Sequence, residues 1–411
     1  MNFSWDYMVN IKDKTHCCGC GACYSICPQK CIEMVEDSEG FLYPRVDEKT
    51  CINCKLCEKV CPVAKPLEGT SKQEIYAFVS KNEDSLKNSA SGGFFYPLAS
   101  YIIKQGGAVF GAAYNAEMKV CHQYTQNIDD LYKFEGSKYV QSDIGDCFVK
   151  VKGFLQNDKY VLFSGTPCQI QGLLKFLNKK LTEKLITLDI VCHGVPSPAV
   201  LKKYFKYLET TYGSKIVNYK FRTKRKGYGR KSYDLNFCQF NDGTQLWGDQ
   251  ECKYFQFMNK AFFAELVSRP SCAHCKFKNK DHVSDFTAFD CWHWKKLSSS
   301  INGAMGATSL IVNTEKANRI LHAIKNACFL DEISFNKTIL YDGFSMIYSI
   351  PHHPKRADFF ESLHQKSIPE LYEEFLELKG FDKAKFFLRK ILDCVGILSF
   401  LRNLKKKYKQ K

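Results

Sequence analysis

The chain has 411 residues, 45% of them hydrophobic and 25% charged, with 59 Lys and Arg against 43 Asp and Glu and a formal net charge of +16. This length predicts about two or three domains, and the composition excludes an intrinsically disordered, a collagen-like and a coiled-coil protein. The opening MNFSWDYMVN has neither region of a signal peptide, and no apolar run approaches ~18 residues, so we expect a cytoplasmic protein.

Cysteine is the residue type that stands out in this composition. The chain contains 21 cysteines, and ten of them fall between residues 17 and 61. An odd, clustered set in a chain of this length is not typical of a secreted disulfide framework. The cysteines therefore favour reduced thiolates that hold metal.

One cysteine pattern occurs twice near the beginning of the chain. Both copies read C-x2-C-x2-C-x3-C-P and lie 34 residues apart. Three closely spaced thiolates can wrap one face of an iron–sulfur cube, and the fourth, which precedes the proline, ligates the other cube. The pattern predicts two 4Fe–4S clusters, one held by Cys17, Cys20, Cys23 and Cys61 and the other by Cys51, Cys54, Cys57 and Cys27.

The alternative for this segment is a pair of four-cysteine zinc sites. Zinc ligands usually come as C-x2-C pairs separated by about a dozen residues or more, which the tight triplets do not match. We therefore predict a small bacterial-ferredoxin-like α+β domain over residues 1–66. Cys18 and Cys31 fall outside the pattern and are interpreted as additional thiols, although Cys18 beside Cys17 leaves the register of the first copy open.

A polar stretch over residues 63–73 marks the boundary with a larger body, which we divide into parts 74–155 and 156–300. Strands are expected at 75–80 and 108–114, and a helix is expected to open at Ser91, Gly92 and Gly93 and to close at Gly106 and Gly107. Residues 160–177 and 185–209 each read as strand, loop and helix. Repeated strand–loop–helix units predict an α/β body with a mixed sheet.

The loops of this body carry the next candidate residues. Backbone amides of SGG (91–93) and GTPCQ (165–169) at helix starts suit an anionic group, although a plain turn is the alternative. Cys168 and Cys192 each follow a strand, so their loops are expected at one edge of the sheet. With the C-x2-C pair Cys272 and Cys275 they form either a third metal site or a set of buried, unpaired thiols.

Two basic stretches are left. Residues 220–231 hold seven Lys or Arg and no acid, and read either as a lid over an anionic group or as a solvated loop. Nucleic acid is disfavoured as a partner because no binding motif accompanies the charge. Residues 301–380 are weakly patterned. We expect residues 381–411 to form a basic amphipathic helical tail, which would lie on an anionic membrane surface, such as the inner membrane, or dock on the body.

With these segments in hand, the chain resembles the coenzyme F420 hydrogenase/dehydrogenase beta-subunit family, in the bacterial form with a fused two-cluster head. The resemblance is carried by SASGGFFYPLASYIIKQGGAVFGAAY, FEGSKYVQSDIGDCF, VLFSGTPCQIQGLLKFL, LDIVCHGVPSP and RPSCAHCKFKNKDHVSDFTAFDCW, roughly residues 75–295. It implies a flavin-binding body, with FAD as the flavin. It also implies a third 4Fe–4S cluster on Cys168, Cys192, Cys272 and Cys275, and a flavin neighbourhood that includes Ser91, Gly92, Gly93, Lys138, Gly165 and Thr166.

The resemblance further implies a function. We expect an iron–sulfur flavoprotein oxidoreductase that relays electrons from a soluble ferredoxin or a similar donor to an unidentified organic substrate, with polysaccharide biosynthesis as the candidate setting. The alternatives are a non-catalytic electron-transfer subunit and, more distantly, a metal-stabilised nucleic-acid binder. His193 is the one candidate catalytic residue, as a proton donor, unless it only orients its loop. The family tends to have Arg, Gly, Phe and Gly where this chain has His282, Phe289, Cys291 and His293, so the deazaflavin coenzyme F420 is not carried over.

Overall fold

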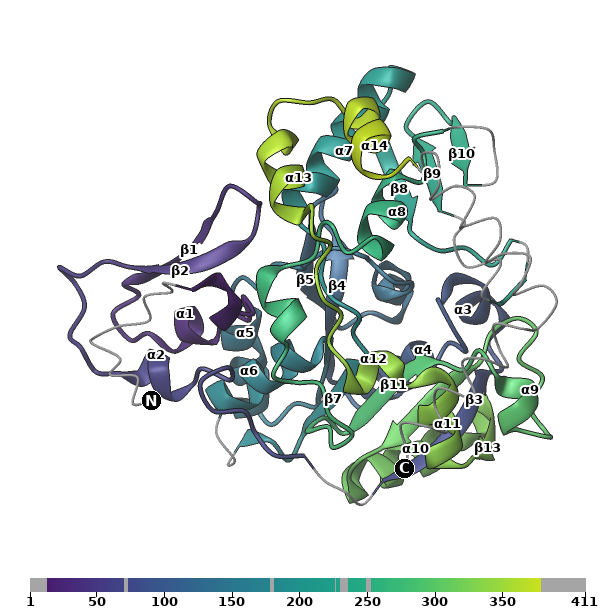
Figure 1. Ribbon diagram of the computed structural model, residues 1–411. Helices are drawn as coiled ribbons and strands as arrows, with labels where there is room; N and C mark the ends of the chain where they lie inside the picture. The colour runs from purple at the N-terminus through teal and green to yellow at the C-terminus, as the bar shows by residue number, and fades with distance from the viewer. Residues whose placement is uncertain are drawn as a thin grey trace, which may run out of the picture.

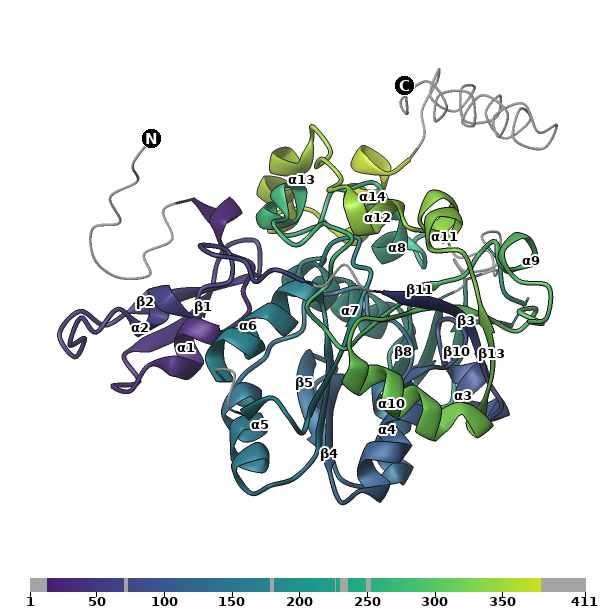
Figure 2. The ribbon, with the colours of Figure 1, turned by 90° about the horizontal axis from the view of Figure 1, so that it is seen from below.

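The computed structural model describes residues 13–69, 73–177, 181–225, 227–229, 236–248 and 253–377. A small head lies to one side of a larger body, against helices α5 and α6 (Figures 1 and 2). The tail predicted over 381–411 lies outside the described residues. No helix in the described part is long and apolar enough to cross a membrane.

The head is a small α+β unit, as the sequence predicts. A left-handed residue, Gly21 in one case and Lys55 in the other, precedes the short helix of each cysteine triplet. An antiparallel hairpin completes the head. Its elements are η1 (Lys14–His16), α1 (Ala22–Ile26), β1 (Ile32–Glu36), β2 (Leu42–Val46) and α2 (Leu56–Lys59).

The body is built on one mixed sheet of eight strands, which confirms the predicted fold class. The four central strands are parallel and the strands outside them are antiparallel. Across the sheet the order is β13 (Cys328–Glu332), β3 (Glu74–Ser80), β12 (Thr308–Val312), β11 (Phe286–Asp290), β7 (Leu185–Ile190), β6 (Val161–Gly165), β4 (Ala108–Tyr114) and β5 (Val120–Thr125).

Helices cover both faces of this sheet because its strands alternate buried side chains. On β6, Val161 and Phe163 pack with one set of helices and Leu162 packs with the other. The first set is α5 (Cys147–Gln156) and α6 (Pro167–Leu177), and the second is α4 (Phe95–Lys104) and α10 (Glu315–Ile324). The edge near β3 is covered by α11 (Phe335–Asp342) and α12 (Phe344–Ile347), with α3 (Glu83–Asn88), η2 (Ile128–Phe134), α9 (Trp294–Leu297) and η5 (Lys325–Ala327) in connecting segments.

A second lobe sits above the carboxyl ends of the central strands (Figure 1). Its core is rich in aromatic rings and is continuous with Phe41 of the head. Its elements are α7 (Pro198–Tyr212), β8 (Ile216–Lys220), β9 (Phe237–Phe240), β10 (Gln245–Trp247), α8 (Phe257–Phe263), η4 (Pro270–His274), α13 (Arg356–Leu363) and α14 (Ile368–Phe375).

The structure differs from the expected division of the body in one respect. Residues 301–380 supply β12, an interior strand that pairs with both β3 and β11. All five residues of β12, TSLIV, are buried, so the segment lacks the alternation that marks a half-exposed strand. The expected helix at 91–93 also begins later, at Phe95, because Gly93 is left-handed (φ 79°) and the Gly92 amide donates to the Thr308 hydroxyl.

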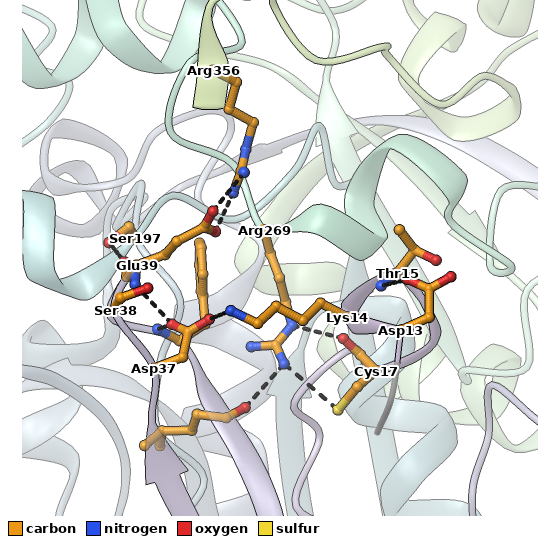
Figure 3. A network of polar contacts seen from close by, with 12 residues as sticks. Asp13, Lys14, Thr15, Cys17, Asp37, Ser38, Glu39, Ser197, Arg269 and Arg356 are labelled. Atoms are coloured by element: carbon orange, nitrogen blue, oxygen red, sulfur yellow. Dashed lines mark hydrogen bonds and ion pairs between the residues drawn. The ribbon is translucent and has the colours of Figure 1, made fainter. Parts of the chain in front are cut away.

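The hairpin of the head fits against the start of α7. Gly40, at the hairpin tip, has a left-handed φ of 87°, and a Cβ added there would lie 2.3 Å from the Cβ of Ala199. The Ser197 hydroxyl donates to the Glu39 carbonyl, and the Arg356 guanidinium holds both Glu39 carboxylate oxygens at 2.5 and 2.9 Å (Figure 3). Because both partners are partly buried, this bidentate pair fixes the hairpin to the second lobe.

Candidate metal centres and cofactor cavity

The first predicted quartet gathers at the inner side of the head. Burial raises the pKa of the Cys23 thiol, and the thiols of Cys17 and Cys61 raise it further. Cys20 also interacts electrostatically with Cys23 and Cys61. Four thiols brought together out of water repel one another once ionised, so this donor set suits a multi-iron cation.

The second quartet lies farther out. Its four members line one cavity, together with Cys31. The Cys27 and Cys31 sulfurs are 3.3 Å apart, whereas Cys54 is exposed to solvent. The quartets therefore differ in position, one facing the body and the other facing water. The four members of the second quartet are Cys27, Cys51, Cys54 and Cys57.

The donor spacing bears on the zinc alternative. A zinc–sulfur bond of about 2.3 Å places tetrahedral thiolates less than about 4 Å apart. A cube holds each thiolate on a different iron, so its thiolates stand farther apart. Among the described residues, no three His, Cys, Asp or Glu side chains lie close enough to hold one metal ion. The C-x2-C-x2-C-x3-C-P spacing is the observation that favours cubes over single zinc ions in the head.

The body cysteines converge as well. Cys168 and Cys192 follow β6 and β7, whose carboxyl ends meet at one sheet edge, as expected for parallel strands. Cys272 lies on η4 and Cys275 directly follows it. These two cysteines line one cavity together with Cys168 and Cys192. Burial raises the pKa of Cys192 to about 12, and the Cys168 and Cys275 thiols add to that effect. Four soft donors in one dry cavity fit a third cluster by the same chemistry.

A larger cavity of about 630 Å³ lies next to the body thiols. Its volume falls within the range of small-molecule sites. The two cavities share one wall, which consists of Thr166, Val191, Cys192, His193, Gly194, Val195 and Ser345. Aromatic rings form much of the rest, including Phe94, Phe95, Phe262, Phe263 and Trp292. A planar ring system bound here would lie beside the body thiols.

Most of the residues expected near a flavin line this larger cavity: Ser91, Gly93, Lys138, Gly165 and Thr166. Gly92 is buried behind the wall, where a Cβ would come within 2.2 Å of the Phe78 carbonyl oxygen. Gly92 therefore allows two backbone segments to pack closely and does not itself line the cavity.

In the GTPCQ loop, the backbone amide of Thr166 donates to a side chain of the same loop. The Gln169 side-chain oxygen accepts from both the amide and the hydroxyl of Thr166, at 3.0 and 3.1 Å. The Gln169 amide donates to Ser142, and the Ser142 hydroxyl contacts His122 Nδ1 at 3.0 Å. Burial lowers the pKa of His122 to about 4, so this ring is neutral near pH 7. The helix start expected to bind an anion is thus capped by its own glutamine.

Cations collect at the opposite side of the cavity, on the predicted basic stretch. Arg222 forms a bidentate pair with Asp290 at 2.9 and 3.2 Å. The Lys224 ammonium donates to the Ser91 carbonyl and to the Ser89 hydroxyl. Burial lowers the pKa values of Lys224 and Lys138 to about 7. The described part of this stretch is packed against the 89–91 loop, so it is not a solvated loop.

His193 lies in the wall between the two cavities. Its Nε2 is 2.5 Å from the Glu265 carboxylate, and its ring packs edge-on against Phe262 and Phe263. These contacts fix the ring orientation. The arrangement is consistent with either expected role, because an oriented imidazole at a cavity wall can also exchange a proton.

Two residues at this site carry no spacing signal in the sequence. Arg269 is fully buried between head and body, and donates to the carbonyls of Cys17 and Leu42 at 2.7 and 2.9 Å (Figure 3). It also lies 3.6 Å from the Cys17 sulfur and 4.2 Å from the Tyr43 ring centre. Cys18, interpreted above as an additional thiol, lines the body cavity. Only tertiary structure could reveal either position.

Comparison with known protein families identifies both parts of the chain. Residues 16–65 match the 4Fe-4S dicluster domain, and residues 158–337 match the C terminus of the coenzyme F420 hydrogenase/dehydrogenase beta subunit. The two matched segments contain the head cysteines and the body cysteines, respectively. Residues 16–65 therefore form a domain for two 4Fe–4S clusters, as the sequence predicts.

Curated relatives match the head. An uncharacterized ferredoxin of Methanocaldococcus jannaschii is 40% identical over 52 residues, 13% of this chain and 66% of that ferredoxin. A ferredoxin 7Fe of Hydrogenibacillus schlegelii is 34% identical over 67 residues, 16% of this chain and 80% of that protein. The solved F420-reducing [NiFe] hydrogenase complex of Methanosarcina barkeri contains a chain that is 15% identical with a TM-score of 0.42, covering 75% of this chain and 94% of that one.

Proposed function

This chain belongs to the coenzyme F420 hydrogenase/dehydrogenase beta-subunit family and is of the iron–sulfur oxidoreductase type, and we propose that it is a flavoprotein with three clusters. Electrons would enter at the head from a ferredoxin-type donor and leave to an organic substrate at the large cavity. Cys168, Cys192, Cys272 and Cys275 would hold the third cluster, and the large cavity would hold FAD.

The observation that carries this proposal is the wall shared by the two body cavities. Cys192 and Thr166 line both of them, and the Thr166 hydroxyl is 3.1 Å from the Cys168 sulfur. Metal donors and a ligand-sized cavity are thus separated by single side chains. A flavin bound there accepts electrons one at a time and delivers two together.

The placement of the two head quartets supports an order of transfer. Cys54 is exposed and its neighbour Ile52 has 61% of its surface exposed, so the second quartet lies where a donor protein can approach. The first quartet contacts the body instead, because α6 packs on Cys20. We therefore place the entry of electrons at the second quartet.

The cations around the large cavity support an anionic cofactor group or substrate. Arg222, Lys138 and Lys224 line it or pack behind its 89–91 loop. A phosphorylated sugar precursor, which the polysaccharide role would require, has the complementary charge. His193, held by Glu265, is the side chain we propose for proton transfer at the wall.

Anoxic purification with iron, sulfide, zinc and flavin analysis tests the proposal. We expect about twelve iron atoms, about twelve sulfides and one flavin per chain, since each cube holds about four of each. About eight iron atoms without flavin would contradict it and indicate a non-catalytic electron-transfer subunit. Stoichiometric zinc without sulfide would contradict the clusters altogether.

A further inference from the structure

Cys18 belongs to neither head quartet and lies between two sets of metal donors. Its side chain is buried, with 8% of its surface exposed. Cys18 packs in one buried cluster with Cys20, a member of the first quartet, and with Cys168, a member of the body set. It also lines the body cavity. The Cys18 side chain therefore packs between the two sets of thiols.

Helix α6 explains why the two sets come so close at this point. Cys168, Gly172 and Lys175 are spaced four and three residues apart, so they lie on one face of the helix. Cys168 lines the same cavity as Cys18, and a Cβ on Gly172 would lie 2.9 Å from the Cys20 sulfur. The same face continues to Lys175, whose ammonium donates to the Cys61 carbonyl at 3.1 Å. This face of α6 therefore packs against two members of the first quartet, Cys20 and Cys61.

The backbone around Cys18 is held by two buried side chains of the body. Gln141 donates from its side-chain amide to the Cys18 carbonyl at 3.0 Å, and Arg269 donates to the Cys17 carbonyl at 2.7 Å. Gln141 also accepts from Arg269 at 2.9 Å. These bonds fix the thiol in the gap, because buried polar groups lose their partners if the segment moves.

We propose that Cys18 is the positioning residue through which electrons pass between the first head cluster and the body cluster. This inference rests on the third cluster of the proposed function. In each transfer the head cluster loses one electron and the body cluster gains one. The thiol itself stays reduced, and no bond to it forms or breaks. Its side chain packs in the buried cluster that contains both Cys20 and Cys168, and it lines the same cavity as Cys168.

The test compares Cys18→Ala and Cys18→Ser with Cys328→Ala in the anoxically purified full chain. Cys328 is also buried, at 4% exposure, but lies on the edge strand β13. Each variant is analysed for iron and flavin, for cluster signals by electron paramagnetic resonance, and for midpoint potentials. The rate at which a pre-reduced ferredoxin reduces the flavin in a single turnover is then measured.

We expect all three variants to keep about twelve iron atoms and unchanged potentials. Cys18→Ala is expected to slow flavin reduction by about tenfold or more, Cys18→Ser by less, and Cys328→Ala not at all. A wild-type rate in fully loaded Cys18→Ala would overturn the inference alone. Loss of about four irons from that variant would also overturn it, because Cys18 would then be a ligand. A wild-type protein with about eight irons would instead overturn the proposed function, and the inference with it.

Discussion

The head and the body hold their thiol quartets by different means. In the head, three members of each quartet lie within seven residues, so a short loop brings them together. In the body, Cys168 and Cys192 meet because β6 and β7 are parallel neighbours. Cys272 joins them from a third segment, which pairs with the loop after β7 through Pro196 and Ser268. A site built by one short loop should keep its ligands when a mutation disturbs another part of the protein. A site built from separate segments needs the whole sheet to be folded.

The largest effect expected from this difference is the loss of a cluster. Cys272→Ala should remove the roughly four irons of the proposed body cluster and stop electron flow to the proposed flavin, while both head clusters remain. Cys54→Ala should remove about four irons from the head and leave the body cluster in place. Iron analysis and electron paramagnetic resonance distinguish the two losses. Cys238→Ala, which replaces a buried cysteine of β9, is the control and should lose none.

If Cys54→Ala also emptied the body site, the two regions would not be independent, and the comparison between motif and fold would fail.

The contact between the two regions is expected to set a redox potential. Arg269→Gln removes a buried positive charge that lies 3.6 Å from the Cys17 sulfur. Because a cation stabilises the reduced, more negative cluster, the potential of the first head cluster should fall by about 60 mV, the one-electron equivalent of a tenfold change. Redox titration followed by electron paramagnetic resonance measures it. Arg45→Gln, which replaces an exposed arginine of the head hairpin that Arg269 contacts, is the control.

An unchanged potential in Arg269→Gln, with the first cluster intact, would mean that the guanidinium acts only as a structural link between head and body.

A smaller effect is expected where α6 packs on the head. An alanine at Gly172 would bring its Cβ within 2.9 Å of the Cys20 sulfur, so Gly172→Ala should lower the free energy of unfolding by about 1–3 kcal/mol. In α5, a Cβ at Gly153 would meet nothing within 4 Å, so Gly153→Ala should raise it by about 0.5–1 kcal/mol. Thermal unfolding of the loaded protein under anoxic conditions compares them. Equal midpoints would show that the head is not tightly packed on α6.

The smallest expected effect concerns the cations of the large cavity. Burial lowers the pKa of Lys224 to about 7, and Glu135, Asp290 and Arg222 also act on this amine. Above pH 7 the amine is neutral in the free protein, so sulfate, whose charge is constant, should bind more weakly as the pH rises from 6 to 8. We expect a several-fold change by calorimetry.

In Lys224→Met this change with pH should shrink, and a profile identical to that of the wild type would exclude the amine as an anion contact. The stability of the fold should change with pH in the opposite direction: sulfate affinity falls as the pH rises, whereas the free energy of unfolding increases. The unfolded chain keeps the proton up to pH 10.5, so burying the neutral amine costs less free energy as the pH rises above 7.

The sequence was sufficient where chemistry repeats at short spacing. The head cysteines, the strands at 75–80 and 108–114, and the strand–loop–helix units of the central sheet follow from local patterns. Arg269 and Cys18 could not be found in this way, because their importance comes from residues more than a hundred positions away in the chain. The interior strand β12 was missed for a different reason, since a fully buried strand shows no alternation.

The hairpin tip has a consequence for how this protein can be re-engineered. Gly40 touches Ala199 so closely that any side chain there would push the hairpin away from α7, and with it the Glu39–Arg356 pair. A free-standing ferredoxin spliced onto this body would therefore need a glycine at the same turn to dock as the native domain does. Gene fusions that ignore this requirement should yield two folded halves that exchange no electrons.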